Sequence, residues 1–192
     1  MHRIGVLGGT FNPIHIGHLA IAQTAKEAAD LEKVIFVPSN WPPHKNINHV
    51  APAKNRYQMV KLAIKGCPGF ELSDFEIKNA GRSFTVETMR YFRKLFPAQT
   101  KLYFIIGGDM LSQLKNWKYI ADILEIATFI VVNRPGEFKQ VKKIPYVSVT
   151  MPGIDISSSY IRQKIKEGKT TKFFVPEAVL RYINQKKLYQ GT

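Results

Sequence analysis

The chain has 192 residues, 45% of them hydrophobic, which suffices for one domain with a core that needs neither disulfides nor a structural metal. No apolar run approaches the roughly 18 residues that span a bilayer, and the apolar part of the N-terminal segment is too short for a signal peptide. The lone Cys67 has no second cysteine to pair with and no zinc-ligand spacing around it. We therefore expect a cytoplasmic protein without a membrane partner.

The charge is strongly positive: 28 Lys and Arg against 14 Asp and Glu give +14. From residue 138 to 192 there are eleven basic and three acidic residues, a net of +8. Such a field attracts polyanions, and nucleic acid is the first partner to consider. The sequence has no basic heptad region, zinc finger or aromatic RNP stretch, however. A solvated basic surface and the steering of small phosphate-bearing substrates are the two other interpretations. The motifs below favour the last, so we expect no nucleic-acid partner.

Apolar β-rich runs alternate along the chain with amphipathic stretches of helical period. The predicted strands are Ile4–Leu7, Val34–Pro38, Glu71–Phe75, Leu102–Ile106, Phe129–Val132 and Tyr146–Val149. The predicted helices are His18–Ala29, Ala53–Ile64, Val86–Leu95, Ala121–Leu124 with its preceding turn, Ser158–Lys166 and Glu177–Gln185. This alternation is typical of right-handed βαβ units and a parallel sheet covered on both faces. We predict one doubly wound α/β domain over residues 1–192, with a C-terminal helical part from about residue 157 to 192.

Ligands of open parallel sheets bind beyond the carboxyl ends of the strands, at the point where the strand order reverses. Polar and glycine-rich segments follow four of the predicted strands at that end. They are residues 8–18, 39–45, 107–109 and 133–136. We expect the functional site to be built from these segments.

The segment after the first predicted strand reads Gly-Gly-Thr-Phe-Asn-Pro-Ile-His-Ile-Gly-His over residues 8–18. Paired glycines allow a tight turn and a close backbone approach to a ligand. The main-chain N–H groups at the start of the following helix favour an anion. His15 and His18 would add side-chain donors, with Gly17 keeping the space between them open. The plainer interpretation is that the histidines only cap the helix or pack in the core. The presence of two histidines around a glycine argues against it.

This segment resembles the HxGH signature of the nucleotidyltransferase superfamily, and its Gly-Gly-Thr-Phe-Asn-Pro prefix resembles the bacterial nicotinate-nucleotide adenylyltransferases. The resemblance implies a Rossmann-like nucleotidyltransferase fold. It also implies that the catalytic residues His15 and His18 contact the phosphates of ATP. The implied ATP-binding residues of this segment are Gly8, Gly9, Thr10, Phe11 and Gly17, whereas Asn12 is on the side of the mononucleotide.

A second segment resembles the superfamily's other signature, Ile-Ser-Ser-Thr-x-Ile-Arg, which binds the triphosphate. It comprises Ile156, Ser157, Ser158, Ser159 and Arg162 at the start of a predicted helix. Serines at such a position are also ordinary N-caps. Ser159 replaces the usual threonine and keeps the hydroxyl, so we expect little functional cost.

The remaining motifs concern the second substrate. A Pro-Pro-His-Lys stretch after the second strand is a stiffened loop on which Lys45 can lie near a phosphate. In the family this stretch contacts the mononucleotide, which assigns His44 and Lys45 to that substrate. Arg56, in the next predicted helix, resembles a family position on the same side. The alternative for the loop is an exposed turn.

A helix start at Thr85 offers N–H groups to a carboxylate, and the indole of Trp117 can stack on a pyridine ring. Thr85 and Trp117 also resemble the family's nicotinate-recognising positions. Gly107 and Asp109 resemble the segment that orients ribose or the phosphates, and the resemblance assigns them to the mononucleotide. Arg134 resembles an adenine-side residue and is assigned to ATP. A cap or a core aromatic is the structural alternative for each of these residues.

The resemblance implies adenylyl transfer from ATP to nicotinate mononucleotide, which gives nicotinate adenine dinucleotide and pyrophosphate in NAD biosynthesis. Mg²⁺ is expected from the family. With no carboxylate cluster and only Asp109 near the motifs, we expect the ion to be held by substrate phosphates and water rather than by protein ligands. Nicotinamide mononucleotide or phosphopantetheine as the acceptor, and a nucleic-acid-binding protein without this activity, are the alternatives. The sequence leaves the oligomeric state open, and a homo-oligomer is compatible with it.

Overall fold

The computed structural model describes residues 2–40, 50–79, 81, 84–135 and 144–190. The described strands form one parallel sheet of six strands in the order β3-β2-β1-β4-β5-β6. They are β1 (Arg3–Gly9), β2 (Lys33–Pro38), β3 (Phe70–Leu72), β4 (Lys101–Gly107), β5 (Thr128–Asn133) and β6 (Tyr146–Thr150). All six predicted strands are therefore present, and the predicted parallel sheet is confirmed.

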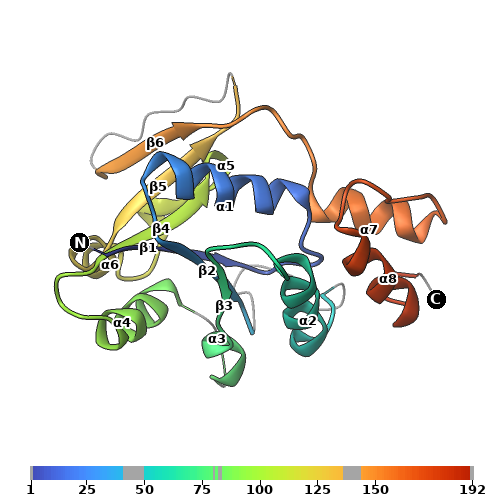
Figure 1. The fold of residues 1–192 in the computed structure, drawn as a ribbon, viewed down its shortest axis with the longest axis horizontal. Coiled ribbons are helices and arrows are strands. Elements are labelled where there is room, and N and C mark those ends of the chain that lie inside the picture. The colour runs from blue at the N-terminus through green and yellow to red at the C-terminus, as the bar shows by residue number, and fades with distance from the viewer. Residues whose placement is uncertain (1, 41–49, 80, 82–83, 136–143, 191–192) are drawn as a thin grey trace.

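Helices follow most of the strands and cover both faces of the sheet. They are α1 (Ile16–Ala28), α2 (Ala53–Ala63), α3 (Phe75–Lys78), α4 (Thr85–Leu95), α5 (Gly108–Leu111), the 3₁₀ turn η2 (Leu114–Asn116), α6 (Ile120–Ile126), α7 (Ser158–Lys166) and α8 (Glu177–Gln185). Figure 1 shows α1 above the sheet and α4 below it. The fold is the predicted doubly wound α/β class.

Two separate apolar clusters form because the side chains of each strand alternate between the two faces. On one face Leu7 and Phe36 pack with Ala22 of α1 and with residues of α2, α7 and α8. On the other face Val6 and Phe104 pack with residues of α4 and α6. Strands buried on both faces need the continuous apolar runs that the sequence shows.

The strand order reverses between β1 and β4. From β1 the chain proceeds outward through β2 to β3, and it then returns to β4 on the other side of β1. The connections that leave β1 and β4 therefore diverge over opposite faces of the sheet. The gap between their carboxyl ends is the position at which doubly wound sheets bind ligands.

Several predicted boundaries differ from the observed ones by one to three residues. The third strand ends at Leu72 rather than Phe75. Ser73 accepts a hydrogen bond from the N–H of Phe75 through its side chain, and this turn starts α3. The first helix begins at Ile16, two residues before the predicted start. The helices α3 and α5 and the turn η2 were not predicted, because segments of three or four residues show no helical period.

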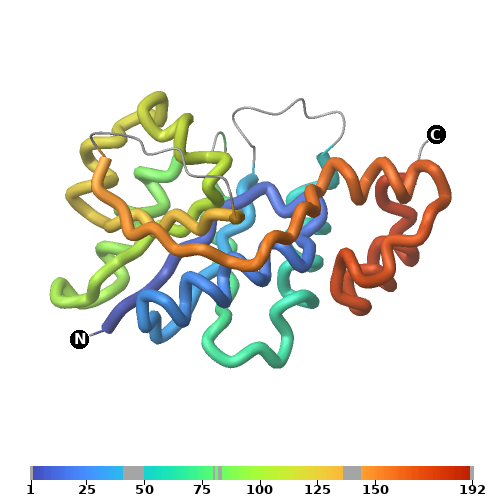
Figure 2. The backbone as a smooth tube through the Cα atoms, turned by 90° about the horizontal axis from the view of Figure 1, so that it is seen from above, coloured from blue at the N-terminus to red at the C-terminus, as the bar shows by residue number. Residues whose placement is uncertain are grey.

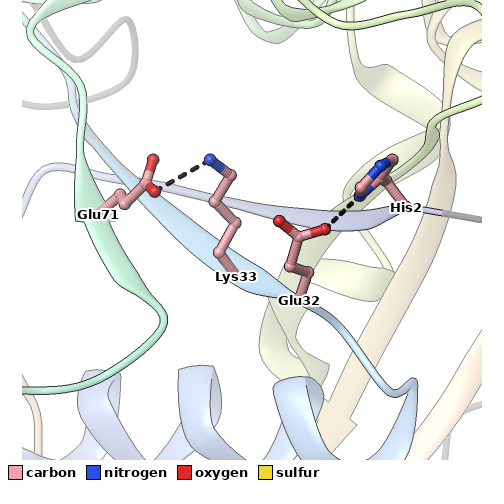
Figure 3. Close-up of polar contacts among 4 residues, drawn as sticks. All are labelled: His2, Glu32, Lys33 and Glu71. Atoms are coloured by element: carbon pink, nitrogen blue, oxygen red, sulfur yellow. Dashed lines mark hydrogen bonds and ion pairs between the residues drawn. The ribbon is translucent and has the colours of Figure 1, made fainter.

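The amino ends of the strands are linked by exposed ion pairs (Figure 3). His2 contacts Glu32 at 2.5 Å, and Lys33 contacts Glu71 at 2.9 Å, which joins the starts of β1, β2 and β3. Exposed pairs of this kind contribute little stability. The hydrogen bonds of the buried Asn12 and Arg56 lie at the opposite end of the strands.

The helices α7 and α8 lie at one end of the molecule in both views (Figures 1 and 2). There α8 packs against α2, with Val179 and Ile183 buried in the same cluster as Met59. Within the described ranges, no helix is both long enough and apolar enough to cross a membrane.

Candidate active site

The connection from β1 to α1 differs from the glycine turn that the sequence predicts. Gly8 and Gly9 are the last two residues of β1, and neither has a positive φ. A Cβ on Gly9 would lie 2.9 Å from the ring of Phe11, and one on Gly8 would lie 3.1 Å from the ring of Phe104. These glycines thus make room for aromatic rings. The left-handed residue of the turn is Phe11, with φ 49° and a buried side chain, and the Asn12–Pro13 peptide that follows is cis.

His15 and His18 form the start of α1 together. His15 is the N-cap, and its main-chain N–H donates to Nδ1 of His18 at 3.2 Å. The two imidazole centroids are 3.7 Å apart, with an angle of 33° between the ring planes. Because Nδ1 of His18 accepts a hydrogen bond, the neutral ring carries its proton on Nε2. His18 therefore presents an N–H donor on the side away from the helix backbone.

His15 is held in the neutral form. Burial lowers its pKa from 6.5 to about 4, and the positive charge of Arg134 lowers it further in the same direction. Its Nδ1 is buried and has no hydrogen-bond partner within the described chain. Gly17 lies against this ring, since a Cβ there would be 3.1 Å from Nδ1. Gly17 thus accommodates the imidazole of His15, as well as separating the two histidines.

The first turn of α1 is less open to an anion than predicted. The N–H of Ile16 donates to the carbonyl of Phe174 at 3.0 Å, and the N–H of His18 donates to the carbonyl of His15 at 3.0 Å. Two of the main-chain donors at this helix start are therefore already paired.

The second signature lies directly beside the first. The carbonyl of Ile156 is 3.8 Å from the position of a Cβ on Gly17. Ser157 is the N-cap of α7 and accepts from the N–H of Tyr160 through its side chain, as the plainer interpretation of these serines predicted. Ser158 donates to the carbonyl of Pro13 at 2.9 Å. The hydroxyls of Ser157 and Ser158 thus both have partners inside the protein.

Arg162 connects α7 to the same loop. Its Nη1 donates to the carbonyl of Asn12 at 2.8 Å, and its Nη2 donates to the hydroxyl of Ser159 at 3.2 Å. Burial lowers the pKa of Arg162, which nonetheless keeps its charge at neutral pH. The guanidinium therefore brings a fixed positive charge to the loop that carries the two histidines.

A cavity of about 220 Å³ opens at the carboxyl ends of β4 and β5, on the face covered by α1. Its walls are Ile21, Gly107, Gly108, Asp109, Val132, Arg134, Met151, Asp155 and Ser157. The predicted residues Gly107, Asp109 and Arg134 are thereby brought together. Arg134 pairs with the exposed Asp155 at 2.8 Å. Sequence reasoning missed Ile21 and Asp155, although Ile21 lies one helical turn after His18 and Asp155 directly precedes Ile156.

Thr85 and Trp117 lie on the other face of the sheet. Thr85 is the first residue of α4, whose N-cap is Phe84. Trp117 is half-buried, with its ring 5.8 Å from that of Phe104. The ammonium group of Lys118 lies 4.8 Å from the ring centroid of Phe84, so the two segments are neighbours. The residues next to the two predicted nicotinate-recognising positions are therefore in contact.

The prediction of a direct substrate contact does not fit Arg56. Its side chain is 1% exposed, and its guanidinium donates to three main-chain carbonyls. These belong to Thr10, Asn40 and Ala51, at 2.8, 2.9 and 2.9 Å. Burial lowers the pKa of Arg56 to about 10, so it stays charged at neutral pH. Arg56 instead joins the loop after β1 to the chain after β2 and before α2.

Asn12 is likewise buried, at 2% exposure. Its Oδ1 accepts from the N–H of Ala51 at 3.0 Å and from the hydroxyl of Tyr189 at 2.8 Å. Tyr189 is a further residue that sequence reasoning missed, because no local pattern links it to a position 177 residues earlier. The predicted mononucleotide residues His44 and Lys45 lie outside the described residues.

No group of three or more His, Cys, Asp or Glu side chains that would hold a metal ion occurs in the described part of the chain. Asp109 and Asp155 are the carboxylates that line the cavity. These two carboxylates alone do not make a protein cage for a metal ion.

Comparison with known proteins agrees with this geometry. The cytidylyltransferase-like family model matches residues 6–164. A probable nicotinate-nucleotide adenylyltransferase of Oceanobacillus iheyensis is 40% identical over 98% of this chain and 97% of its own length. One from Listeria monocytogenes serotype 4b is 43% identical over the same shares of the two chains. The structure of Plasmodium falciparum nicotinic acid mononucleotide adenylyltransferase complexed with NaAD superposes with a TM-score of 0.84 over 98% of both chains. At 20% identity, this last likeness concerns the fold alone.

Proposed function

The chain belongs to the nicotinate-nucleotide adenylyltransferases of the cytidylyltransferase-like family, and from that premise we propose how its site transfers an adenylyl group from ATP to nicotinate mononucleotide. The products are nicotinate adenine dinucleotide and pyrophosphate. The observation that carries the proposal is the His15–His18 pair at the gap between β1 and β4, with the start of α7 beside it.

The two substrates bind on the two faces of the sheet. The 220 Å³ cavity on the α1 side takes the adenosine of ATP, with Arg134 in its wall. Asp109, predicted on the mononucleotide side, lines the same cavity, and we reassign it to ATP. Thr85 and Trp117 on the α4 side take the nicotinate ring. The gap between β1 and β4 connects these positions. The reacting phosphates therefore meet there, beside His15 and His18.

The phosphate side of ATP lies between α1 and α7. His15 and His18 donate to the α- and β-phosphates, and the turn from Ser157 to Arg162 lies beside the β- and γ-phosphates. Ser158 and Arg162 now bind loop carbonyls, so a phosphate either shares or replaces those partners. The helix start and the guanidinium both favour this negative charge. On the acceptor side we assign His44 and Lys45 to the phosphate of the mononucleotide, as the family resemblance implies.

The chemistry needs no general base. The acceptor is a phosphate monoester whose second pKa is about 6, so its oxygen is already anionic at neutral pH. That oxygen forms a bond to the α-phosphorus while the bond to the bridging oxygen breaks, and pyrophosphate leaves with the electron pair. Neutral imidazoles that donate N–H groups stabilise the charge on the transferred group. The lowered pKa of His15 and the Nε2–H form of His18 suit this role.

Magnesium enters this proposal with the substrate. Mg²⁺ keeps several waters and binds readily to nucleotide phosphates. Since the described residues offer no protein cage, we propose that the ion is bound by the phosphates of ATP and by water. No step above depends on a protein ligand to the metal.

The test is a pyrophosphate-release assay with ATP and a panel of acceptors: nicotinate mononucleotide, nicotinamide mononucleotide and phosphopantetheine. We expect the highest kcat/KM with nicotinate mononucleotide, because a helix start and an indole match a carboxylate on an aromatic ring. An equal or higher kcat/KM with nicotinamide mononucleotide would contradict the assignment of nicotinate mononucleotide as the preferred acceptor. Turnover of none of the three acceptors would contradict the proposed transfer.

A further inference from the structure

Tyr189 lies after the last described helix, yet it contacts the loop between β1 and α1. Its hydroxyl donates to Oδ1 of Asn12 at 2.8 Å. Asn12 is three residues before His15 and is buried. The contact therefore joins the C-terminal segment to the loop that carries both histidines.

The orientation of the Asn12 side chain follows from its partners. The N–H of Ala51 can only donate, so the atom it meets at 3.0 Å is the oxygen of the amide. Tyr189 must then donate to the same oxygen, which engages both of its lone pairs. The main-chain carbonyl of Asn12 accepts from Arg162 as well. Asn12 is thus the point at which three distant segments meet.

The backbone holds Tyr189 in place for this contact. Lys187 and Tyr189 have φ values of 51° and 64°, in the left-handed region that residues other than glycine seldom adopt. The N–H of Leu188 between them donates to the carbonyl of Ile183, which folds the segment back on α8. Burial raises the pKa of Tyr189, so the hydroxyl keeps its proton at neutral pH. The chain thus adopts an uncommon conformation that directs a phenol hydroxyl to the loop.

We propose that Tyr189 is a positioning residue for adenylyl transfer: through Asn12 it sets the β1–α1 loop and hence the placement of the His15 and His18 imidazoles. It touches no substrate. The proposal rests on the proposed function, because it takes the two histidines as the phosphate donors.

The matched pair of variants is Tyr189→Phe and Tyr182→Phe. Each removes one tyrosine hydroxyl that donates to an asparagine Oδ1, but the partner of Tyr182 is Asn55 of α2, at 3.2 Å, outside the β1–α1 loop. We expect Tyr189→Phe to lower kcat by about 10-fold with little change in either KM, because small displacements of catalytic donors cost rate. Tyr182→Phe should keep the wild-type kcat. Both rates are taken per folded molecule, with the folded fraction from circular dichroism.

Two further measurements separate positioning from loss of stability. In an Asn12→Ala background, Tyr189→Phe should have no additional effect on kcat, because the hydroxyl has lost its partner. In the protein alone, the NMR signals of the His15 and His18 rings should shift in Tyr189→Phe and stay unchanged in Tyr182→Phe.

An unchanged kcat and unchanged histidine signals in Tyr189→Phe would overturn the proposal. The proposal would also be overturned if Tyr189→Phe lowered kcat by the same factor in the Asn12→Ala background as in the wild type. The NMR comparison does not depend on enzyme turnover. A wild-type protein that releases no pyrophosphate would contradict the proposed function. The chemical shifts of the histidine rings would still show whether Tyr189 positions them.

Discussion

The main-chain N–H of His15 donates to Nδ1 of His18, and this contact joins the two histidines of the HxGH signature at the start of α1. His18 is left with its N–H on Nε2, and its ring lies in edge contact with Phe11, at 5.1 Å between centroids. His15 is buried and kept neutral, with a pKa of about 4. We propose that the two rings act as hydrogen-bond donors rather than as an acid and a base.

Replacing His18 by Ala should lower kcat by roughly 100-fold or more, as for the loss of one donor to a developing oxyanion. The measurement is pyrophosphate release under saturating substrates. His2→Ala is the control, because this exposed histidine lies at the amino end of the sheet. Near-normal turnover of His18→Ala would reduce His18 to a capping residue.

The stability of the protein should depend on pH through His15. The unfolded chain takes up the proton as the pH falls below 6.5, whereas the folded protein resists until the pH is about 4. The free energy of unfolding therefore falls by about 3 kcal/mol across that window and loses nothing more from His15 below it.

Urea unfolding at several pH values between 7 and 4, for the wild type and His15→Asn, measures this contribution as a difference. Carboxylates titrate in both proteins and cancel in the comparison. If the free energy of unfolding changed with pH in the same way in both proteins, the burial of a neutral His15 would be contradicted.

Gly17→Ala should lower turnover while the fold is retained. The new Cβ would lie 3.1 Å from Nδ1 and 3.2 Å from Cε1 of His15, so the imidazole has to move by a few tenths of an ångström. Gly153→Ala is the matched control: among the described residues its Cβ would meet Pro135, at 3.6 Å, an ordinary contact. Steady-state kinetics of both variants check the prediction, and equal kcat values would refute it.

Arg56→Lys should destabilise the protein by roughly 3 kcal/mol, since one ammonium group cannot replace a fork that donates to three buried carbonyls. The control is Arg181→Lys, whose exposed pair with Glu177 predicts no measurable change. Urea unfolding at pH 7 gives both values. An Arg56→Lys variant as stable as the wild type would show that the carbonyls find other donors.

Local residue patterns were enough to predict the class of fold and the end of the sheet at which the motifs meet. Apolar runs buried on both faces require a parallel sheet, and their alternation with helices led to all six strands. The HxGH segment and the Ile156–Arg162 segment were also recognised from their local residue order. Parallel strands place their carboxyl ends at one edge, so these motifs meet there whatever the details.

The contacts of several of these residues could be learned only from the three-dimensional fold. Gly8 and Gly9 resemble a turn in the sequence, but they end β1, and the rings of Phe104 and Phe11 occupy the space that a Cβ would need. Arg56 resembles a ligand contact, but carbonyls from three separate segments surround it. Tyr189 shows no local signal at all. Hydrogen bonds and burial depend on neighbours brought together by the fold over long sequence separations, and no residue pattern of short range encodes them.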